Sequence, residues 1–324
     1  LPRTPGPAPF LPIPATLGDA MPPPSAPSRP ELEAVEFFTV ADLVARGART
    51  STARQALAGM TPGDGAQGLR RLRQMELEPL WSRDPASLPV AVFDEAQAEL
   101  LNPAGWLQPE HWRQLREGLR SVARLLRTIA ALEWPEAQPA PRGTHLGIDR
   151  LRVTAAILAD PEPLADRLAR SFTEDGQLDP LRIPTLAELH RDRQRRFQAV
   201  QGCLQKLLRE LPEAFQEPTI VERNGRFCLP VRTERRGQVP GLVLDRSGSG
   251  ATVFLEPFEA VPANNDYVEA DRAFSEAVQA FLRELLEELR GRREDFERWH
   301  RFQADVDEAL ALLRWSALCE GGLP

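Results

Sequence analysis

Two long amphipathic stretches, separated by a short segment with a different pattern, constrain the fold of this chain most strongly. Apolar residues recur at three- and four-residue steps over residues 185–211 and again from about 262 to 319, which is the spacing of one apolar helix face. A helix of about 27 residues is roughly 40 Å long. The pattern therefore predicts two antiparallel helices that form an arm and carry a small module at its tip.

The segment between these helices, residues 219–262, has the pattern of short β-strands. Its β-branched and aromatic runs are separated by turn residues, and Asn224-Gly225 is a strong signal for a tight hairpin. Gly237, Gly248 and Gly250 mark further turns. We predict three or four antiparallel strands, at 219–223, 226–232, 240–245 and 251–256.

The residues before the arm predict a helical core. The clearest apolar stripe runs from Trp112 to Ile129, and Pro109 occupies a favoured first helical position. Val90–Phe93 suggests a short extended piece, and residues 171–179 a turn or small hairpin. The other predicted elements are helices at 35–46, 50–59, 66–78, 147–159 and 162–171, and a Pro/Gly-rich loop at 134–146.

The predicted fold class is mainly α with a small β module, and the chain divides into five parts. The start is broken throughout by proline and has no continuous apolar core, so it predicts a disordered leader rather than a signal peptide. Because Met21 lies inside this segment, an alternative interpretation is that the segment is upstream sequence translated by mistake. The predicted boundaries are 1–33 for the leader, 34–183 for the helical core, 184–218 for the ascending helix, 219–262 for the β module and 263–324 for the returning helix.

Several kinds of catalytic or cofactor site lack the residues that they require. A phosphate-binding P-loop needs a lysine directly after its glycines, whereas Lys206 lies inside a predicted helix. Ser249 has Ser247 in place of the glycine that a nucleophile elbow needs, and a predicted strand follows it. The histidines do not show the spacing of metal ligands. We therefore expect no catalytic residue, metal or cofactor in this chain.

The cysteines and the hydropathy pattern bear on the cellular setting. Cys203, Cys228 and Cys319 are scattered and odd in number, which argues against a disulfide framework. No stretch approaches the roughly 18 apolar residues of a membrane span. We therefore expect a reducing, cytoplasmic setting and no membrane partner.

Basic residues gather in the predicted β module, although the chain as a whole has a net charge of −7. Residues 221–246 contain six arginines and three acids, Glu222, Glu234 and Asp245, which gives a local charge of +3. Such a surface suits the phosphates of a nucleic-acid backbone, with a merely solubilising surface as the alternative. No row of aromatic residues accompanies it, so we expect no reading of bases. The candidate nucleic-acid-binding residues are Arg223, Arg226, Arg232, Arg235, Arg236 and Arg246.

One block of the sequence resembles a signature of the second bacterial MutS subfamily, here MutS-two. It begins with RNGRFCLPVR at Arg223–Arg232, continues through PGLVLD, SGSGAT and FLEP, and ends at Ala263–Asn265, in the order and spacing of that family. It departs from the family at Leu244, where histidine is usual, and at Arg232 and Ala263. Weaker similarity covers most of the chain after residue 34, including EFFTVADLVARGARTSTARQALAGMTP and DVDEALALLRWSAL.

The resemblance implies that the long helices are the lever of this family and the β module its clamp. The two arms of a homodimer are then expected to encircle DNA, particularly branched recombination intermediates, in DNA repair and the suppression of recombination. The family is also implicated in ribosome quality control, where the clamp would meet ribosomal RNA of stalled ribosomes. Its ATPase domain, which uses ATP and magnesium, and its Smr nuclease domain match no part of this chain, so the resemblance is to the core, lever and clamp alone.

Two functions of different classes stay open at this point. The first is a module that grips the backbone of DNA or ribosomal RNA without sequence specificity. The alternative is a helical dimerisation or scaffold module that binds no nucleic acid of its own, because the apolar spacing of residues 263–319 also suits a partner helix. The default for that face is packing against residues 185–211 of the same chain. We expect no enzymatic activity from this chain.

Overall fold

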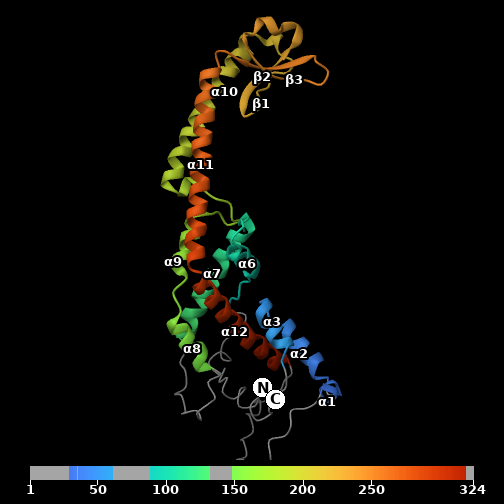
Figure 1. The fold of residues 1–324 in the computed structure, drawn as a ribbon, viewed down its shortest axis with the longest axis vertical. Helices are drawn as coiled ribbons and strands as arrows, with labels where there is room; N and C mark the ends of the chain where they lie inside the picture. The colour runs from blue at the N-terminus through green and yellow to red at the C-terminus, as the bar shows by residue number, and fades with distance from the viewer. Residues whose placement is uncertain (1–28, 35, 61–87, 132–147, 319–324) are drawn as a thin grey trace, which may run out of the picture.

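The computed structural model describes residues 29–34, 36–60, 88–131 and 148–318 of the 324-residue chain. The described part is mainly helical, with a helical base, a long two-helix arm and a small sheet at the tip of the arm (Figure 1). The predicted fold class is therefore confirmed. The helix expected at 66–78, the loop expected at 134–146 and residues 1–28 of the expected leader lie outside the described residues.

The base is built from short helices around one long amphipathic helix, α7. Its stripe is buried as predicted, with Leu115, Leu119, Val122 and Ile129 fully enclosed. Gly118 on this helix lets Phe93 approach, since a Cβ there would lie 2.3 Å from the Phe93 ring. The helices of the base are α1 (Arg29–Ala34), α2 (Phe37–Arg46), α3 (Ser51–Ala58), α6 (Asp94–Leu101), α7 (Pro109–Ala130), α8 (Ile148–Ile157) and α9 (Glu162–Ser171).

Two details of the base differ from the sequence predictions. Helix α1 covers the last residues of the expected disordered leader, because Pro30 can occupy the first turn of a helix and the residues after it are good helix formers. The piece expected at Val90–Phe93 is not part of a sheet within the described residues, and Phe93 instead packs into the core. The expected hairpin at 171–179 is present as a bridge between Phe172 and Leu178.

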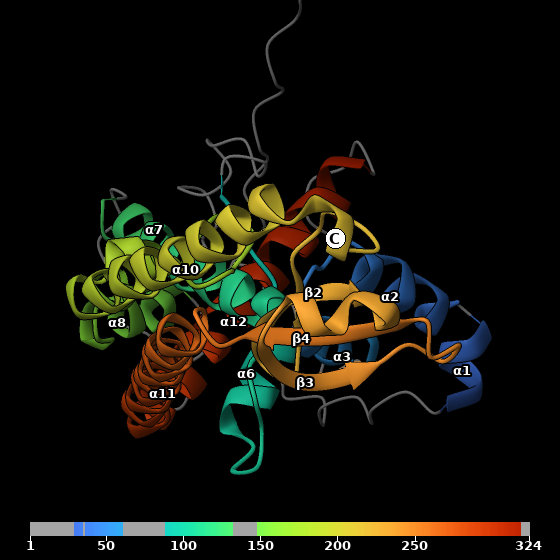
Figure 2. The same cartoon turned by 90° about the horizontal axis from the view of Figure 1, so that it is seen from above.

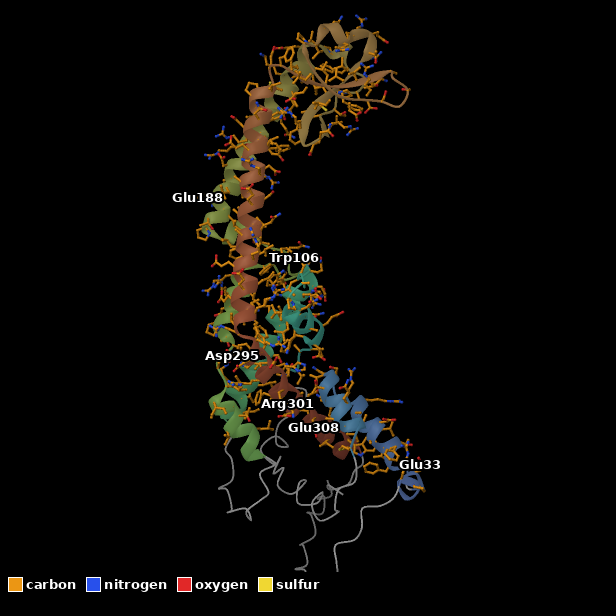
Figure 3. The ribbon with its side chains drawn as sticks, in the orientation of Figure 1. Glu33, Trp106, Glu188, Asp295, Arg301 and Glu308 are labelled. Carbon is orange, nitrogen blue, oxygen red and sulfur yellow. The ribbon has the colours of Figure 1, made fainter. Side chains whose placement is uncertain are left out.

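The arm consists of α10 (Pro184–Glu210), which rises from the base, and α11 (Val261–Gly291), which returns to it beside α10 (Figure 1). The chain bends at Arg292 and continues as α12 (Arg293–Leu318) through the base. Surface side chains such as Glu188 project from the arm into solvent (Figure 3). The short 3-10 helices η2 (Pro180–Arg182) and η3 (Pro212–Ala214) flank α10.

The apolar stripe of the returning helices is buried within the chain itself. Phe296, Trp299, Phe302 and Val306 of α12 lie in the same core as α7 and α9. Asp307 of α12 anchors α3, because its Oδ2 accepts hydrogen bonds from the backbone N–H groups of Arg49 and Thr50, both at 2.7 Å. The face that sequence analysis offered to a partner helix is thus already used for intramolecular packing.

The sheet at the tip has four strands: β1 (Val221–Arg223), β2 (Arg226–Arg232), β3 (Gly241–Arg246) and β4 (Thr252–Pro257). Their order is β1-β2-β4-β3, and all neighbours are antiparallel. Asn224 and Gly225 both have positive φ, 53° and 73°, as the predicted tight hairpin requires. The 3-10 helix η4 (Thr233–Gln238), which sequence analysis did not predict, carries the chain from β2 past β4 to β3.

A second, separate core holds the sheet on the arm. It contains Val200, Leu204 and Leu207 of α10 together with Leu229 and Leu255 of the sheet. Seen from above, the sheet extends to one side of the arm, over the part of the base formed by α2 and α3 (Figure 2). The sheet is therefore held out on the arm by a small core of its own.

Candidate nucleic-acid interface

The strand register brings distant arginines to one end of the sheet. Arg232 is the last residue of β2 and lies opposite Thr252, and Arg246 is the last residue of β3 and lies opposite Val253. Helix η4 starts from the same end, where the Thr233 backbone N–H donates to the Ala251 carbonyl at 3.0 Å. We refer to Arg232, Arg235, Arg236 and Arg246 as the arginine tip.

The side chains of the arginine tip are exposed and hold few intramolecular partners. Arg235 and Arg236 lie on η4, and within the described residues neither forms an ion pair or a side-chain hydrogen bond. The same holds for the side chain of Arg246. Arg232 donates from Nε to the Phe215 carbonyl at 3.2 Å and is otherwise exposed. These four guanidinium groups can therefore meet an external anion without breaking an ion pair that the structure shows.

Arg226, one of the candidate phosphate contacts, is paired within the sheet. Its Nε and Nη2 each donate to Glu256 at 2.8 Å, and Nη2 also donates to Asn265 at 2.6 Å. The side chain of Glu256 is only 1% exposed. A buried carboxylate needs this partner, because an unpaired charge there carries a large desolvation cost.

Arg223 is also largely engaged within the sheet. Its guanidinium lies over the Phe254 ring, 4.3 Å from the centroid. Its Nη1 donates to the Glu222 carbonyl at 2.8 Å, and its Nε lies 3.5 Å from Asp245. The Arg223 side chain remains 40% exposed, so a phosphate could reach it. The phosphate would then share the guanidinium group with the Asp245 carboxylate. The structure thus separates Arg223 and Arg226 from the four residues of the arginine tip.

Asn264 joins the sheet to the arm, and sequence analysis did not single it out. The residue is fully buried in the first turn of α11. Its side chain accepts from the Phe227 N–H at 3.1 Å and donates to the Phe227 carbonyl at 2.9 Å and to Glu256 at 2.9 Å. Its signal in the sequence was its place in the ANN end of the signature block.

Three aromatic rings reinforce the same joint. Phe197 of α10, Phe227 of β2 and Tyr267 of α11 have their ring centroids 5.1 to 5.9 Å apart. Burial raises the pKa of the Tyr267 hydroxyl above its ordinary value. Tilted ring pairs at these distances are favourable beyond their buried area. The joint therefore fixes the direction in which the sheet presents the arginine tip.

The cysteine of the sheet is poorly suited to reaction. Cys228 is fully buried in β2, and burial raises the pKa of its thiol to about 11. Because the thiolate is the reactive form, this group stays protonated and inert near neutral pH. Cys203 on α10 also has its pKa raised by burial.

A second run of arginines, on α10, is largely paired. Arg193 lies 3.3 Å from Asp271 and over the Phe274 ring, and Arg196 lies 2.7 Å from Asp266. Both pairs cross from α10 to α11, where few buried apolar side chains hold the middle of the arm. These arginines connect the two helices, so we do not add them to the interface.

Among the residues that the structure describes, no group of His, Cys, Asp and Glu is arranged to hold a metal ion. None of the described helices has the length and apolar character needed to cross a membrane.

Comparisons with known proteins place the chain in a family. No family model matches it. A protein of Thermus thermophilus named Endonuclease MutS2 is 31% identical over 261 residues, which are 81% of this chain and 33% of that protein. Proteins of the same name from Thermomicrobium roseum and Symbiobacterium thermophilum are 32% and 26% identical over 64% and 78% of this chain.

The shared region is a limited part of those relatives. This chain spans 33%, 25% and 31% of the length of the three proteins. The similarity agrees with the signature block in the sheet and with the weaker resemblance over the base. The chain therefore belongs to a MutS2-like family.

Proposed function

We propose that this region grips the sugar-phosphate backbone of DNA through the arginine tip, without reading its sequence. The observation that carries the proposal is a set of four exposed arginines on a sheet held out on a long arm, two at one end of the sheet and two on the 3-10 helix that starts from that end. Guanidinium groups bind phosphate oxygens in charge-assisted pairs and release counterions when they do so. The overall charge of −7 limits this attraction to the tip.

The relatives named Endonuclease MutS2 favour DNA as the partner. We extend this role to branched DNA and recombination intermediates as the preferred substrates, with two arms of a homodimer closing on them. Ribosomal RNA of stalled ribosomes has the same kind of phosphate backbone, so the test below includes ribosomes as a second ligand. The scaffold alternative has less support, because the part of the apolar stripe from Leu285 onward is already buried in the core of the base.

Binding to a four-way DNA junction, a linear duplex and ribosomes, measured over a range of salt concentrations, tests the proposal. Four phosphate contacts predict a slope of log K against log salt of about −3.6 on duplex DNA. The variant Arg235→Glu/Arg236→Glu removes two contacts, so we expect weaker binding and a slope of about −2 or shallower. The matched control is Arg191→Glu/Arg283→Glu, which makes the same charge change on the exposed surface of the arm.

Salt-dependent binding that the tip variant loses and the control keeps supports the proposal. Equal binding by both variants contradicts it. Preference for ribosomes over both DNA forms would move the assignment to ribosomal RNA. A dimeric mass without nucleic acid, together with no binding to any of the three, would favour the scaffold function.

A further inference from the structure

A second basic site lies in the helical base, well away from the sheet. A pocket of about 690 Å³, wide open to solvent, is lined there by residues of α7, of α9, of the segment that follows α9 and by Ala91. Volumes in this range are typical of small-molecule sites. The lining contains four arginines, Arg116, Arg120, Arg124 and Arg182, together with Ala91, Glu117, Ala169, Phe172 and Glu174.

Three of these arginines form a row along one face of α7. Arg116, Arg120 and Arg124 are spaced four residues apart, which places them on neighbouring turns of the same face. The row extends for about 12 Å along the helix. Arg120 and Arg124 are exposed, and neither forms an ion pair or a side-chain hydrogen bond within the described residues.

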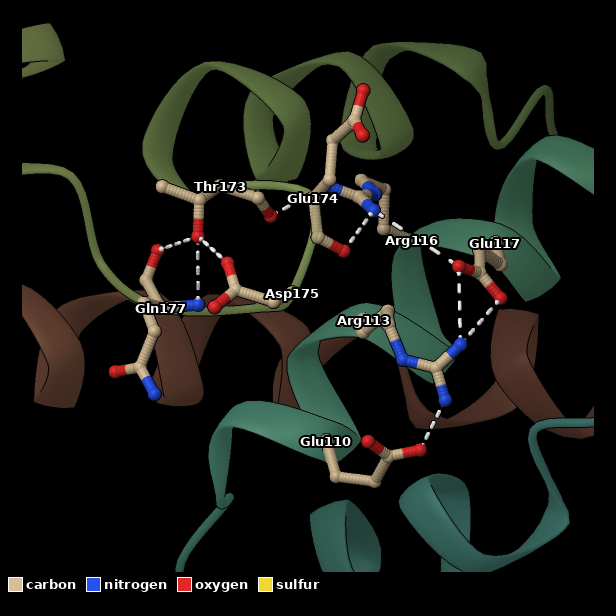
Figure 4. A network of polar contacts seen from close by, with 8 residues as sticks. All are labelled: Glu110, Arg113, Arg116, Glu117, Thr173, Glu174, Asp175 and Gln177. Atoms are coloured by element: carbon tan, nitrogen blue, oxygen red, sulfur yellow. Dashed lines mark hydrogen bonds and ion pairs between the residues drawn. The ribbon is translucent and has the colours of Figure 1, made fainter.

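Arg116 is fixed at one end of this row and has a donor to spare. It is only 7% exposed, and Nη1 and Nη2 donate to the carbonyl oxygens of Thr173 and Glu174 at 2.7 and 2.8 Å (Figure 4). Its Nε is buried and has no hydrogen-bond acceptor. Because its other two nitrogens hold the carbonyls of this turn, Arg116 keeps its positive charge at the inner end of the row without an acidic hydrogen-bond partner.

The acidic groups beside the cavity do not neutralise the row. Glu117 is paired with Arg113 at 3.2 Å, and its nearest approach to Arg116 is 4.0 Å (Figure 4). Arg182 is paired with Asp179 at 2.8 Å, outside the lining. Glu174 also lines the cavity, so its four arginines face two glutamates, and the lining keeps an excess of positive charge, most accessible at Arg120 and Arg124.

The wall that holds Arg116 is itself a firm turn. The Thr173 N–H donates to the Gln177 carbonyl at 2.8 Å. The Gln177 N–H donates back to Thr173 Oγ1 at 3.1 Å (Figure 4). Gly176 at this turn has φ of +84°, and a Cβ there would lie 1.9 Å from the Pro109 carbonyl oxygen. The two carbonyls that orient Arg116 are thus held in place before any ligand arrives.

We propose that this cavity binds the phosphate groups of a small molecule that carries a di- or triphosphate. A row of guanidinium groups on successive turns matches several linked anionic groups, whereas one carboxylate would leave most of the row unused. The two exposed, unpaired members of the row, Arg120 and Arg124, supply the donors, and the buried charge of Arg116 adds to the attraction at one end. The site is separate from the arginine tip, so this proposal does not depend on whether the arginine tip binds DNA.

Titration calorimetry of the whole chain with inorganic tripolyphosphate, at constant ionic strength, tests this proposal. We expect saturable binding and a higher melting temperature in its presence. Arg120→Gln/Arg124→Gln removes two exposed, unpaired donors, so it should fold normally and weaken binding by about tenfold or more. The matched control is Arg46→Gln/Arg191→Gln, which removes two exposed arginines elsewhere and should bind as the unaltered chain does.

No saturable binding, or equal loss in both variants, would overturn the proposal. Competition by a short DNA duplex distinguishes the source of the phosphates. A duplex that displaces tripolyphosphate in the Arg235→Glu/Arg236→Glu background assigns the cavity to a nucleic-acid strand. A duplex that does not displace it assigns the cavity to a free polyphosphate.

Discussion

Replacing Arg226 by glutamine tests whether this arginine holds the sheet together or contacts phosphate. The substitution removes two charge-assisted bonds to Glu256, both 2.8 Å long, and leaves a carboxylate that is 1% exposed without its cation. Breaking a buried pair in this way costs about 3–5 kcal/mol. Arg226 itself is 25% exposed, and solvent screens its side of the pair, so we expect a loss of about 2–3 kcal/mol.

The assay is native-state hydrogen exchange of the backbone amides in β2 and β4, because these strands belong to a core separate from that of the base. The free energy of opening should fall in these strands and stay unchanged in α7. Arg235→Gln, at an exposed and unpaired position, is the control and should change neither. Adding Glu256→Gln should recover part of the loss, since the unpaired charge is then gone.

Two results would refute this reasoning. The first is a loss of less than about 0.5 kcal/mol in the sheet, which is the size of a surface pair. The second is normal exchange combined with a DNA-binding salt slope that is shallower by about one unit, as expected for a lost phosphate contact.

Three further predictions concern the base. Asp307→Ala should destabilise the chain by about 3 kcal/mol in a urea titration, because it removes the acceptor of the buried Thr50 N–H and hydroxyl and of the partly buried Arg49 N–H; a loss below 1 kcal/mol, on the order of one ordinary hydrogen bond, would contradict this. Gly118→Ala should destabilise the chain by about 1–3 kcal/mol through overpacking, measured as a lower melting temperature, since its Cβ would meet Phe93 at 2.3 Å, whereas Gly202→Ala, with no atom near, should be harmless. Hydrogen bonds from His300, and secondly from Ser51, lower the pKa of Asp94 from 3.8 to about 2. The contribution of this carboxylate to stability is therefore fully present above pH 3.8 and is lost as the pH falls toward 2. In acid titrations, the stability of Asp94→Asn should decline less steeply over this range than that of the unaltered chain, and an identical curve would contradict the assignment.

Apolar periodicity predicted the helices well wherever one face is buried. The stripe of α7 and the lengths of α9 and α10 follow the sequence closely, because burial of that stripe decides where each helix lies. The strands were displaced by one or two residues at β1, β3 and β4. Their ends depend on register and on the crossover through η4, and these tertiary features leave a weak local signal.

Counting charges along the sequence located the candidate interface, but it could not distinguish the arginines that face solvent from those that are paired within the sheet. Arg226 and Arg235 have the same side chain in the same stretch of sequence, yet one pairs with the buried Glu256 and the other faces solvent. The difference arises from residues 30 positions away on β4, which local patterns do not reveal. The arginine row on α7 escaped notice for a different reason: Glu110 and Glu117 lie on the same helix, and the structure shows that both pair with Arg113 and not with the exposed Arg120 and Arg124.

The position of the arginine tip follows from the way the arm is built. The middle of the arm is held by ion pairs such as Arg193–Asp271 and Arg196–Asp266 and by few buried apolar side chains. Exposed pairs of this kind contribute little stability and weaken with salt. The two ends of the arm are instead fixed by separate apolar cores. Bending is therefore expected in the middle of the arm, so that the sheet moves as a unit and keeps its four arginines together while it adjusts to the backbone that it grips.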